Sequence, residues 1–129
     1  MPETIQFLLL PGFSAMGFIS ALEPLRVANR FRSALYRWSV LSLDGGAVQA
    51  SNGMSINADA ALGDVEKGQI LLIVAGFEPL AFFGPALQQT LRRFDHEGVI
   101  LGGIDTGAVV LAEAGLLDGH RATLHWEAL

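Results

Sequence analysis

Short apolar runs recur along the chain and predict the strands of its fold. Three of them span residues 5–10, 69–75 and 99–104. Runs of this length that are apolar at almost every position are typical of strands buried on both faces of a parallel sheet. Residues 36–43 instead alternate around Trp38 and predict a further strand.

A serine and a proline mark the first predicted helix. Ser14 is placed to cap it, and Phe18, Leu22 and Leu25 recur along one face. Pro24 lies inside this pattern. Because a proline ring displaces the carbonyl group four residues earlier, we expect the helix to kink or restart there.

Two more helices are predicted at residues 79–96 and 108–114, ended by Gly98 and Gly115. Because strands and helices alternate, we expect a flavodoxin-like, three-layer α/β/α sandwich with a central, mostly parallel sheet. Ligands bind such a sheet in the crevice at the carboxyl ends of its strands.

The composition fits one compact domain covering residues 1–129. The chain is 51% hydrophobic and 16% charged, and its mean hydropathy of +0.43 predicts elements buried on several faces, or a surface that meets a neighbour. No apolar run approaches the roughly 20 residues of a membrane span, and residues 5–10 are too short for a signal peptide. We expect a cytoplasmic protein without a membrane partner.

Cysteine is absent, which excludes disulfides, thiolate metal sites and a cysteine nucleophile. The net charge of −5 lacks the basic surface that binding to a phosphate backbone requires, so we do not expect this chain to bind DNA by itself. Four arginines are interpreted as solvated or ion-paired surface residues: Arg26, Arg30, Arg32 and Arg37. No spacing of acidic residues and histidines indicates a metal, and the glycines near residue 103 lack the dinucleotide fingerprint, so no cofactor is predicted.

Asp105 follows the third apolar run directly and precedes a helix. A side chain on a sharp turn between a buried strand and a helix is lifted out of the sheet and points into the crevice, beside the free amides of the helix. The alternative is that Asp105 only caps the helix, which aspartate does well.

Six sequence blocks occur in an order that is typical of one protein family. They cover residues 8–13, 21–26, 50–53, 103–108, 114–119 and 121–126. Together they resemble the N-terminal domains of GlxA-type regulators of the AraC family, over nearly the whole chain. Those domains are ThiJ/PfpI-type members of the class I glutamine amidotransferase-like superfamily, and in such regulators a helix-turn-helix domain follows.

The resemblance implies which residues occupy the reacting centre of the related enzymes. It places their nucleophilic cysteine at Asp105, an acidic residue of the first helix at Glu23, and oxyanion-hole amides at Gly76, Phe77 and Thr106. ThiJ/PfpI peptidases have a histidine after the cysteine, where this chain has Thr106. Because a carboxylate cannot replace a thiolate attacking a carbonyl group, we expect no such catalysis.

The same resemblance implies a sensing role. If Glu23 lies near Asp105, the two carboxylates share a proton or recruit a cation. Relatives of this type sense amino acids or quaternary ammonium metabolites, which need an anion site and a cation site together. We therefore expect a small zwitterionic effector in this crevice.

Aromatic residues at the predicted strand ends are candidates for contacting that effector. They are Phe13, Phe77 and Trp126, and an aromatic face attracts an ammonium group by about 0.5–2 kcal/mol. The alternative for Phe13 and Phe77 is that they close the core beneath the loops.

The three histidines divide into one candidate and two surface residues. His125 lies in a block typical of the family, so it either donates to the ligand or is a structural residue. His96 and His120 are predicted at a helix end and in a turn, where we expect exposure.

The position of Asp105 is also compatible with two other functions. Residues 104–108 are similar to the active-site turn of aspartic proteases, but those proteins are all-β and place this turn between strands, whereas here a helix follows. The second rival is a hydrolase of the same fold that uses Asp105 as nucleophile or general base.

The resemblance also implies partners. Domains of this family continue beyond the block at residues 121–126, so we expect residues 1–129 to be an incomplete sensing domain. We expect a homodimer, with DNA bound only through a helix-turn-helix domain absent from this chain.

Overall fold

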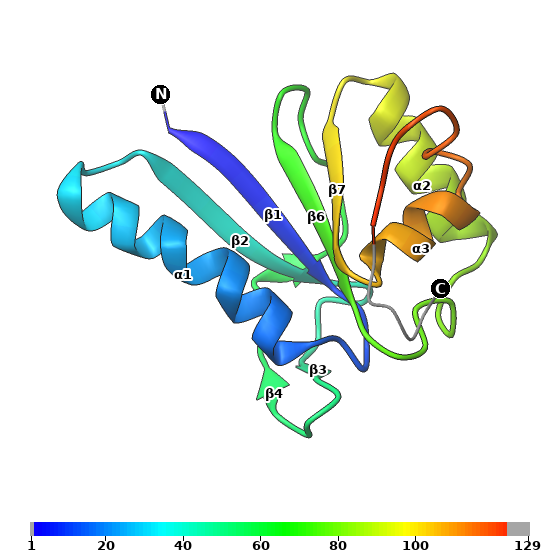
Figure 1. Cartoon of the computed structure of the whole chain (residues 1–129), viewed down its shortest axis with the longest axis horizontal. Coiled ribbons are helices and arrows are strands. Elements are labelled where there is room, and N and C mark those ends of the chain that lie inside the picture. The colour runs from blue at the N-terminus through cyan, green and yellow to red at the C-terminus, as the bar shows by residue number, and fades with distance from the viewer. Residues whose placement is uncertain (1, 124–129) are drawn as a thin grey trace.

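A five-stranded sheet in the order β5-β2-β1-β6-β7 runs through the centre of the computed structural model, which describes residues 2–123 (Figure 1). Its strands are β1 (Glu3–Leu9), β2 (Tyr36–Ser42), β5 (Ala60–Ala61), β6 (Ile70–Ala75) and β7 (Ile100–Asp105). Every pairing in this sheet is parallel. A separate antiparallel pair is formed by β3 (Val48–Gln49) and β4 (Ser55–Ile56).

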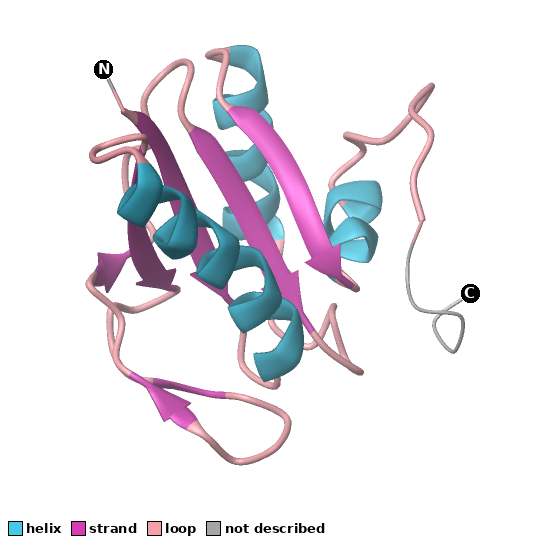
Figure 2. Ribbon diagram, turned by 60° about the vertical axis from the view of Figure 1, so that its left-hand side comes forward, coloured by secondary structure: helices cyan, strands magenta, loops and turns pink. Residues whose placement is uncertain are grey.

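Helices cover both faces of the sheet. α1 (Ala15–Phe31) lies along one face, while α2 (Pro85–His96) and α3 (Gly107–Glu113) lie on the other, as Figures 1 and 2 show. Each helix follows a strand in the chain, which is the connection that a parallel sheet requires. The predicted three-layer α/β/α sandwich is confirmed.

The core consists of two apolar clusters, one on each side of the sheet. Phe7 and Leu9 of β1 pack with Phe18 of α1, whereas Leu8 packs on the opposite side with Phe94 of α2. Successive side chains of a strand point to opposite faces, so a central strand covered on both sides must be apolar at consecutive positions. This explains the first apolar run of the sequence.

The first helix begins as predicted but does not break at its proline. The Ser14 hydroxyl accepts a hydrogen bond from the N–H of Gly17 at 3.0 Å, which is an N-cap. α1 then continues without interruption through Pro24 to Phe31. Of the kink or restart expected at Pro24, the restart is therefore wrong.

The predicted start of the second helix at residue 79 is also wrong. Residues 77–84 form turns, and α2 begins only at Pro85 after the extended Gly84. Proline lacks the N–H that a helix interior needs but fits the first helical position, so Pro85 sets the start.

The third apolar run is not buried on both faces, because β7 is the edge strand of the described sheet. The exposed fraction of Ile100 is 54%. Leu71 and Ile73 of β6 are instead fully buried, as expected for an inner strand.

The predicted exposure of two histidines is confirmed, because His96 and His120 lie at the surface. None of the described helices is long and apolar enough to cross a membrane. Arg26 pairs with Glu23 at 2.5 Å. Arg30, Arg32 and Arg37 are exposed and form no ion pair with any described residue.

Candidate functional site

Asp105 lies on a sharp, strained turn between β7 and α3. It is the last residue of β7, and its φ of 55° lies in the left-handed region, which non-glycine residues rarely adopt. α3 begins two residues later at Gly107. The predicted strand-turn-helix geometry is confirmed, and because the turn joins a parallel strand to a helix, it is not the strand-to-strand turn of an aspartic protease.

Glycines on both sides of Asp105 make this tight turn possible. A β-carbon on Gly107 would overlap the carbonyl oxygen of Ile73, and one on Gly103 would overlap the backbone of Ala108. Each glycine therefore allows a backbone-to-backbone approach that any side chain would prevent. The start of α3 is held directly against β6 by these contacts.

A second close approach joins the loops that follow β1 and β6. A β-carbon on Gly76 would overlap the carbonyl oxygen of Gly12. The buried Thr106 donates a short hydrogen bond from its hydroxyl to the carbonyl oxygen of Gly76. The turns after β1, β6 and β7 thus meet at the carboxyl edge of the sheet, where a parallel α/β sheet binds ligands.

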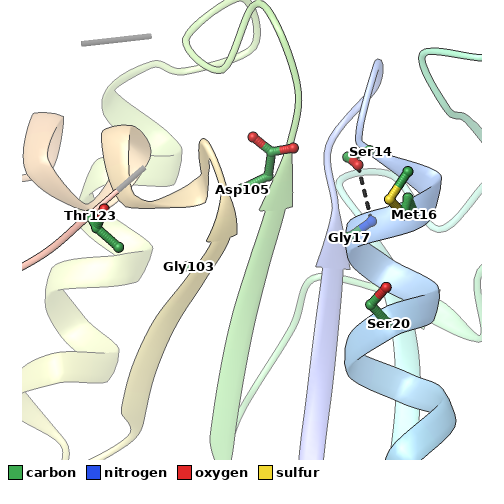
Figure 3. Close-up of a pocket in the computed structure, with 7 residues that line it drawn as sticks. All are labelled: Ser14, Met16, Gly17, Ser20, Gly103, Asp105 and Thr123. Carbon is green, nitrogen blue, oxygen red and sulfur yellow. Dashed lines mark hydrogen bonds between the residues drawn. The ribbon is translucent and has the colours of Figure 1, made fainter. Parts of the chain in front are cut away.

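An open pocket of about 430 Å³ lies beside Asp105 (Figure 3). The residues that line it come from the start of α1, from β7 and from the segment after α3: Ser14, Met16, Gly17, Ser20, Gly103, Asp105 and Thr123. Figure 3 shows the Asp105 carboxylate beyond the strand ends, with Ser14, the N-cap residue of α1, across the pocket. Among residues 2–123 this carboxylate forms no ion pair, so it is available to a ligand.

A family model described as the DJ-1/PfpI family matches residues 3–129. The chain belongs to the DJ-1/PfpI family.

Two relatives of this DJ-1/PfpI domain are named as transcription regulators. The chain is 69% identical over 129 residues to the HTH-type transcriptional regulator CdhR of Pseudomonas aeruginosa, covering all of this chain and 38% of that protein. It is 40% identical over 127 residues to the HTH-type transcriptional regulator GlxA of Rhizobium meliloti, covering 97% of this chain and 39% of that protein. The chain thus spans less than half the length of these relatives.

Solved structures agree with this assignment. The structure of an AraC family transcriptional regulator from Pseudomonas putida matches with a TM-score of 0.87 and 30% identity, covering 98% of this chain and 68% of that one. The predicted resemblance to regulators of the AraC family is confirmed. These matches are to regulators, which favours a non-enzymatic domain.

Glu23 is not among the residues that line the Asp105 pocket. Its carboxylate instead binds the Arg26 side chain one turn along the same helix. α1 leaves the carboxyl edge of the sheet at Ser14, and at 1.5 Å per residue Glu23 lies about 13 Å further along the helix axis. The helix residues beside the pocket carry no charge, so the described pocket contains one carboxylate instead of the expected pair.

Phe13 and Phe77, the two described aromatic candidates, occupy opposite environments. Phe13 is fully buried and contacts Phe18 edge to face with a centroid distance of 6.2 Å, so its role is in the core. Phe77 has an exposed fraction of 77% and lines a different pocket, after β6. The alternative that both close the core holds for Phe13 alone.

Two candidates, His125 and Trp126, lie outside the described residues. Three hydroxyl-bearing pocket residues were missed: Ser14, Ser20 and Thr123. The sequence predicts only a capping role for Ser14, and Ser20 lies about 1.7 turns beyond it on α1. Among the described residues no group of acidic residues and histidines is placed to hold a metal ion.

Proposed function

We propose that the chain is the non-catalytic, ligand-sensing and dimerisation domain of a bacterial AraC-family transcription regulator. Its effector is a small zwitterion, an amino acid or a quaternary ammonium compound, bound in the pocket beside Asp105. The observation that carries this proposal is the Asp105 carboxylate, which forms no ion pair with any of residues 2–123 and is held on a strained turn at the edge of an open pocket. Strained backbone persists where the surrounding structure enforces it, and it is common at functional sites.

The chemistry of the pocket supports a ligand with two charges. The Asp105 carboxylate attracts an ammonium group, and the hydroxyl groups of Ser20 and Thr123 add hydrogen-bonding capacity. Gly76 and Thr106 are not among the residues that line the pocket. Their backbone N–H groups form no hydrogen bond within residues 2–123, so they remain the proposed donors to an anionic group that extends beyond the pocket. Glu23 is not part of the proposed site, and His125 remains a candidate hydrogen-bond donor to the ligand.

The residues around Asp105 support the proposed role in binding without turnover. The pocket's described residues include no histidine, lysine or second carboxylate that would act as a partner in acid–base catalysis. The rival hydrolase needs such a partner or a water activated by Asp105 itself. Assays of small esters, amides and halides separate the two functions, because hydrolysis that depends on Asp105 would contradict the sensor.

Dimerisation and DNA binding belong to the whole regulator. Large apolar side chains on α1 are exposed, with Met16 at 80% and Phe31 at 84%, which favours contact with another surface. We propose a homodimer that positions helix-turn-helix domains outside this chain on paired DNA half-sites. Sedimentation equilibrium of the full-length regulator tests this part, and a monomer at all concentrations would contradict it.

The binding proposal is tested by thermal denaturation with a panel of amino acids and betaine-like and carnitine-like compounds. A ligand at 100 times its Kd stabilises the native state by about 2.7 kcal/mol. We expect one class to stabilise the wild type, and Asp105→Asn to lose most of that stabilisation. Asp95→Asn is the matched control, since Asp95 is an exposed residue of α2 that lines neither of the two pockets. No stabilisation by any compound, or equal stabilisation of Asp105→Asn, would contradict the proposal.

A further inference from the structure

The turns between β6 and α2 expose two aromatic rings at the carboxyl edge of the sheet. Phe77 is 77% exposed and Phe82 is 53% exposed, whereas the adjacent Phe83 packs against the core cluster of α2 and α3. Four other phenylalanines of the chain are buried. Burying a phenylalanine side chain stabilises a fold by about 1.5–3 kcal/mol, so two exposed rings in one short segment indicate a surface that contacts another molecule.

Phe77 and Phe82 line an open pocket of about 330 Å³ together with Glu78. Pro11 and Gly12 form another wall, and Ser51 from the turn after β3 completes it. None of these residues lines the Asp105 pocket. It is therefore a second candidate site, separate from the one proposed above.

Backbone hydrogen bonds fix the segments that form this pocket. Ala81 donates to the carbonyl oxygen of Glu78 at 3.2 Å, and Gly12 donates to Gln49 at 2.8 Å. Ser51 donates to the carbonyl oxygen of Phe13 at 2.9 Å. The rings and the carboxylate are thus carried by ordered turns, which reduces the conformational entropy that a ligand must overcome.

The Glu78 carboxylate is exposed and forms no ion pair in the described part of the chain. Aromatic faces attract cations through the ring quadrupole, and a carboxylate adds a full negative charge. We propose that Phe77, Glu78 and Phe82 form a binding site for an organic ammonium ion. Methylated ammonium groups contact the rings, while a primary ammonium group also donates hydrogen bonds to Glu78.

This inference goes beyond the proposed effector pocket and is tested without it. Choline and its neutral isostere 3,3-dimethyl-1-butanol have the same shape and differ in charge, and ethanolamine supplies a primary ammonium group. Each is titrated into the isotopically labelled protein, and backbone and phenylalanine ring resonances are followed by NMR. We expect saturable shifts around residues 77–82 for choline or ethanolamine, and at least 5-fold weaker binding of the neutral isostere, which corresponds to about 1 kcal/mol.

Variants identify the groups responsible. Phe82→Leu keeps an apolar side chain but removes the ring, and we expect it to raise the Kd of choline about 2- to 30-fold. Glu78→Gln keeps the shape and removes the charge, and we expect a similar increase. The matched controls are Phe31→Leu and Glu113→Gln, which change exposed residues away from the pocket and should leave the Kd unchanged.

Equal binding of the neutral isostere would show a merely apolar pocket and overturn the inference. Shifts confined to other residues, or an unchanged Kd in both pocket variants, would overturn it as well. The position of the shifted resonances separates the two sites, because the pockets share no lining residue. Choline bound at this site shifts residues 77–82, and choline bound beside Asp105 shifts residues 103–105. Choline-induced shifts near Asp105 alone would remove the second site, whereas failure of the metabolite panel would leave this site intact.

Discussion

The hydroxyl group of Thr106 donates a hydrogen bond to the carbonyl oxygen of Gly76, and this bond joins the turn after β7 to the turn after β6. Thr106 has an exposed fraction of only 3%, so water does not readily replace the hydroxyl group. ThiJ/PfpI peptidases have a histidine at the position of residue 106. In this chain the position is used to hold two turns together.

Replacing Thr106 with valine, which has nearly the same shape, removes this hydrogen bond. We expect Thr106→Val to lower the free energy of unfolding by about 1–3 kcal/mol, because the Gly76 carbonyl group loses its partner in a buried setting. Chemical denaturation measures the change. Thr106→Ser keeps the hydroxyl group and should lose less stability; a valine variant as stable as the wild type would show that the bond contributes nothing.

Substitution of Gly107 should be far more damaging than an ordinary glycine substitution. The added β-carbon of Gly107→Ala overlaps the carbonyl oxygen of Ile73, and neither backbone moves without separating α3 from β6. We expect a loss of at least about 3 kcal/mol, or failure to fold. Gly63→Ala is the control, because the nearest atom to its β-carbon is a carbonyl oxygen at 3.7 Å. Comparable stability of the two variants would contradict the packing described here.

The left-handed backbone of Asp105 predicts an order of stability for substitutions there. Glycine adopts this conformation without strain, asparagine and aspartate tolerate it, and a β-branched residue does not. We expect Asp105→Gly and Asp105→Asn to unfold near the wild-type midpoint, and Asp105→Val to be less stable by about 1–2 kcal/mol. Urea denaturation of the three variants checks the order.

Ala34 provides an independent check of the same principle, since its φ of 64° is also left-handed. This residue is exposed in the turn before β2, away from the Asp105 pocket. We expect Ala34→Gly to stabilise the protein by about 0.5–1 kcal/mol through relief of strain. A destabilised glycine variant would indicate that the backbone at this turn is not left-handed.

Phe13 and Phe77 should respond differently to truncation. Phe13→Ala removes a fully buried ring that contacts Phe18, and we expect a loss of about 3–5 kcal/mol. Phe77→Ala removes a mostly exposed ring and should change stability by less than about 0.5 kcal/mol. Thermal unfolding compares the two. Equal losses would mean that Phe77 is part of the core.

The layers of this fold could be predicted because a strand that is buried on both faces is apolar at consecutive positions of the sequence. Phe7, Leu8 and Leu9 point alternately to the two clusters, and no polar residue fits at any of these positions. The start of α2 was harder to predict. Pro79 and Pro85 both suit the first helical position, and the residues between them are as apolar as a helix face, so local preferences did not separate the two.

The candidate site was predicted in part, for a geometric reason. Asp105 was found because its turn joins two elements that adjoin in sequence. Glu23 was placed wrongly because sequence similarity gives no distance along a helix, and that distance decides whether a side chain on α1 reaches the crevice. Phe82 was missed because it lay inside the segment predicted to be helical, residues 79–96, and Glu78, which directly precedes that segment, was assigned no role.

Residues 11–14 contribute a wall to each pocket, with Pro11 and Gly12 beside Phe77 and Ser14 beside Asp105. This segment has little freedom, because Gly12 touches Gly76 and Ser14 donates a hydrogen bond from its backbone to Ala75 at 3.4 Å. A molecule that displaces the segment from one side alters the cavity on the other. Thermodynamic linkage makes this effect mutual. If a ligand in one pocket changes the affinity of the other pocket by some factor, a ligand in that other pocket changes the affinity of the first by the same factor.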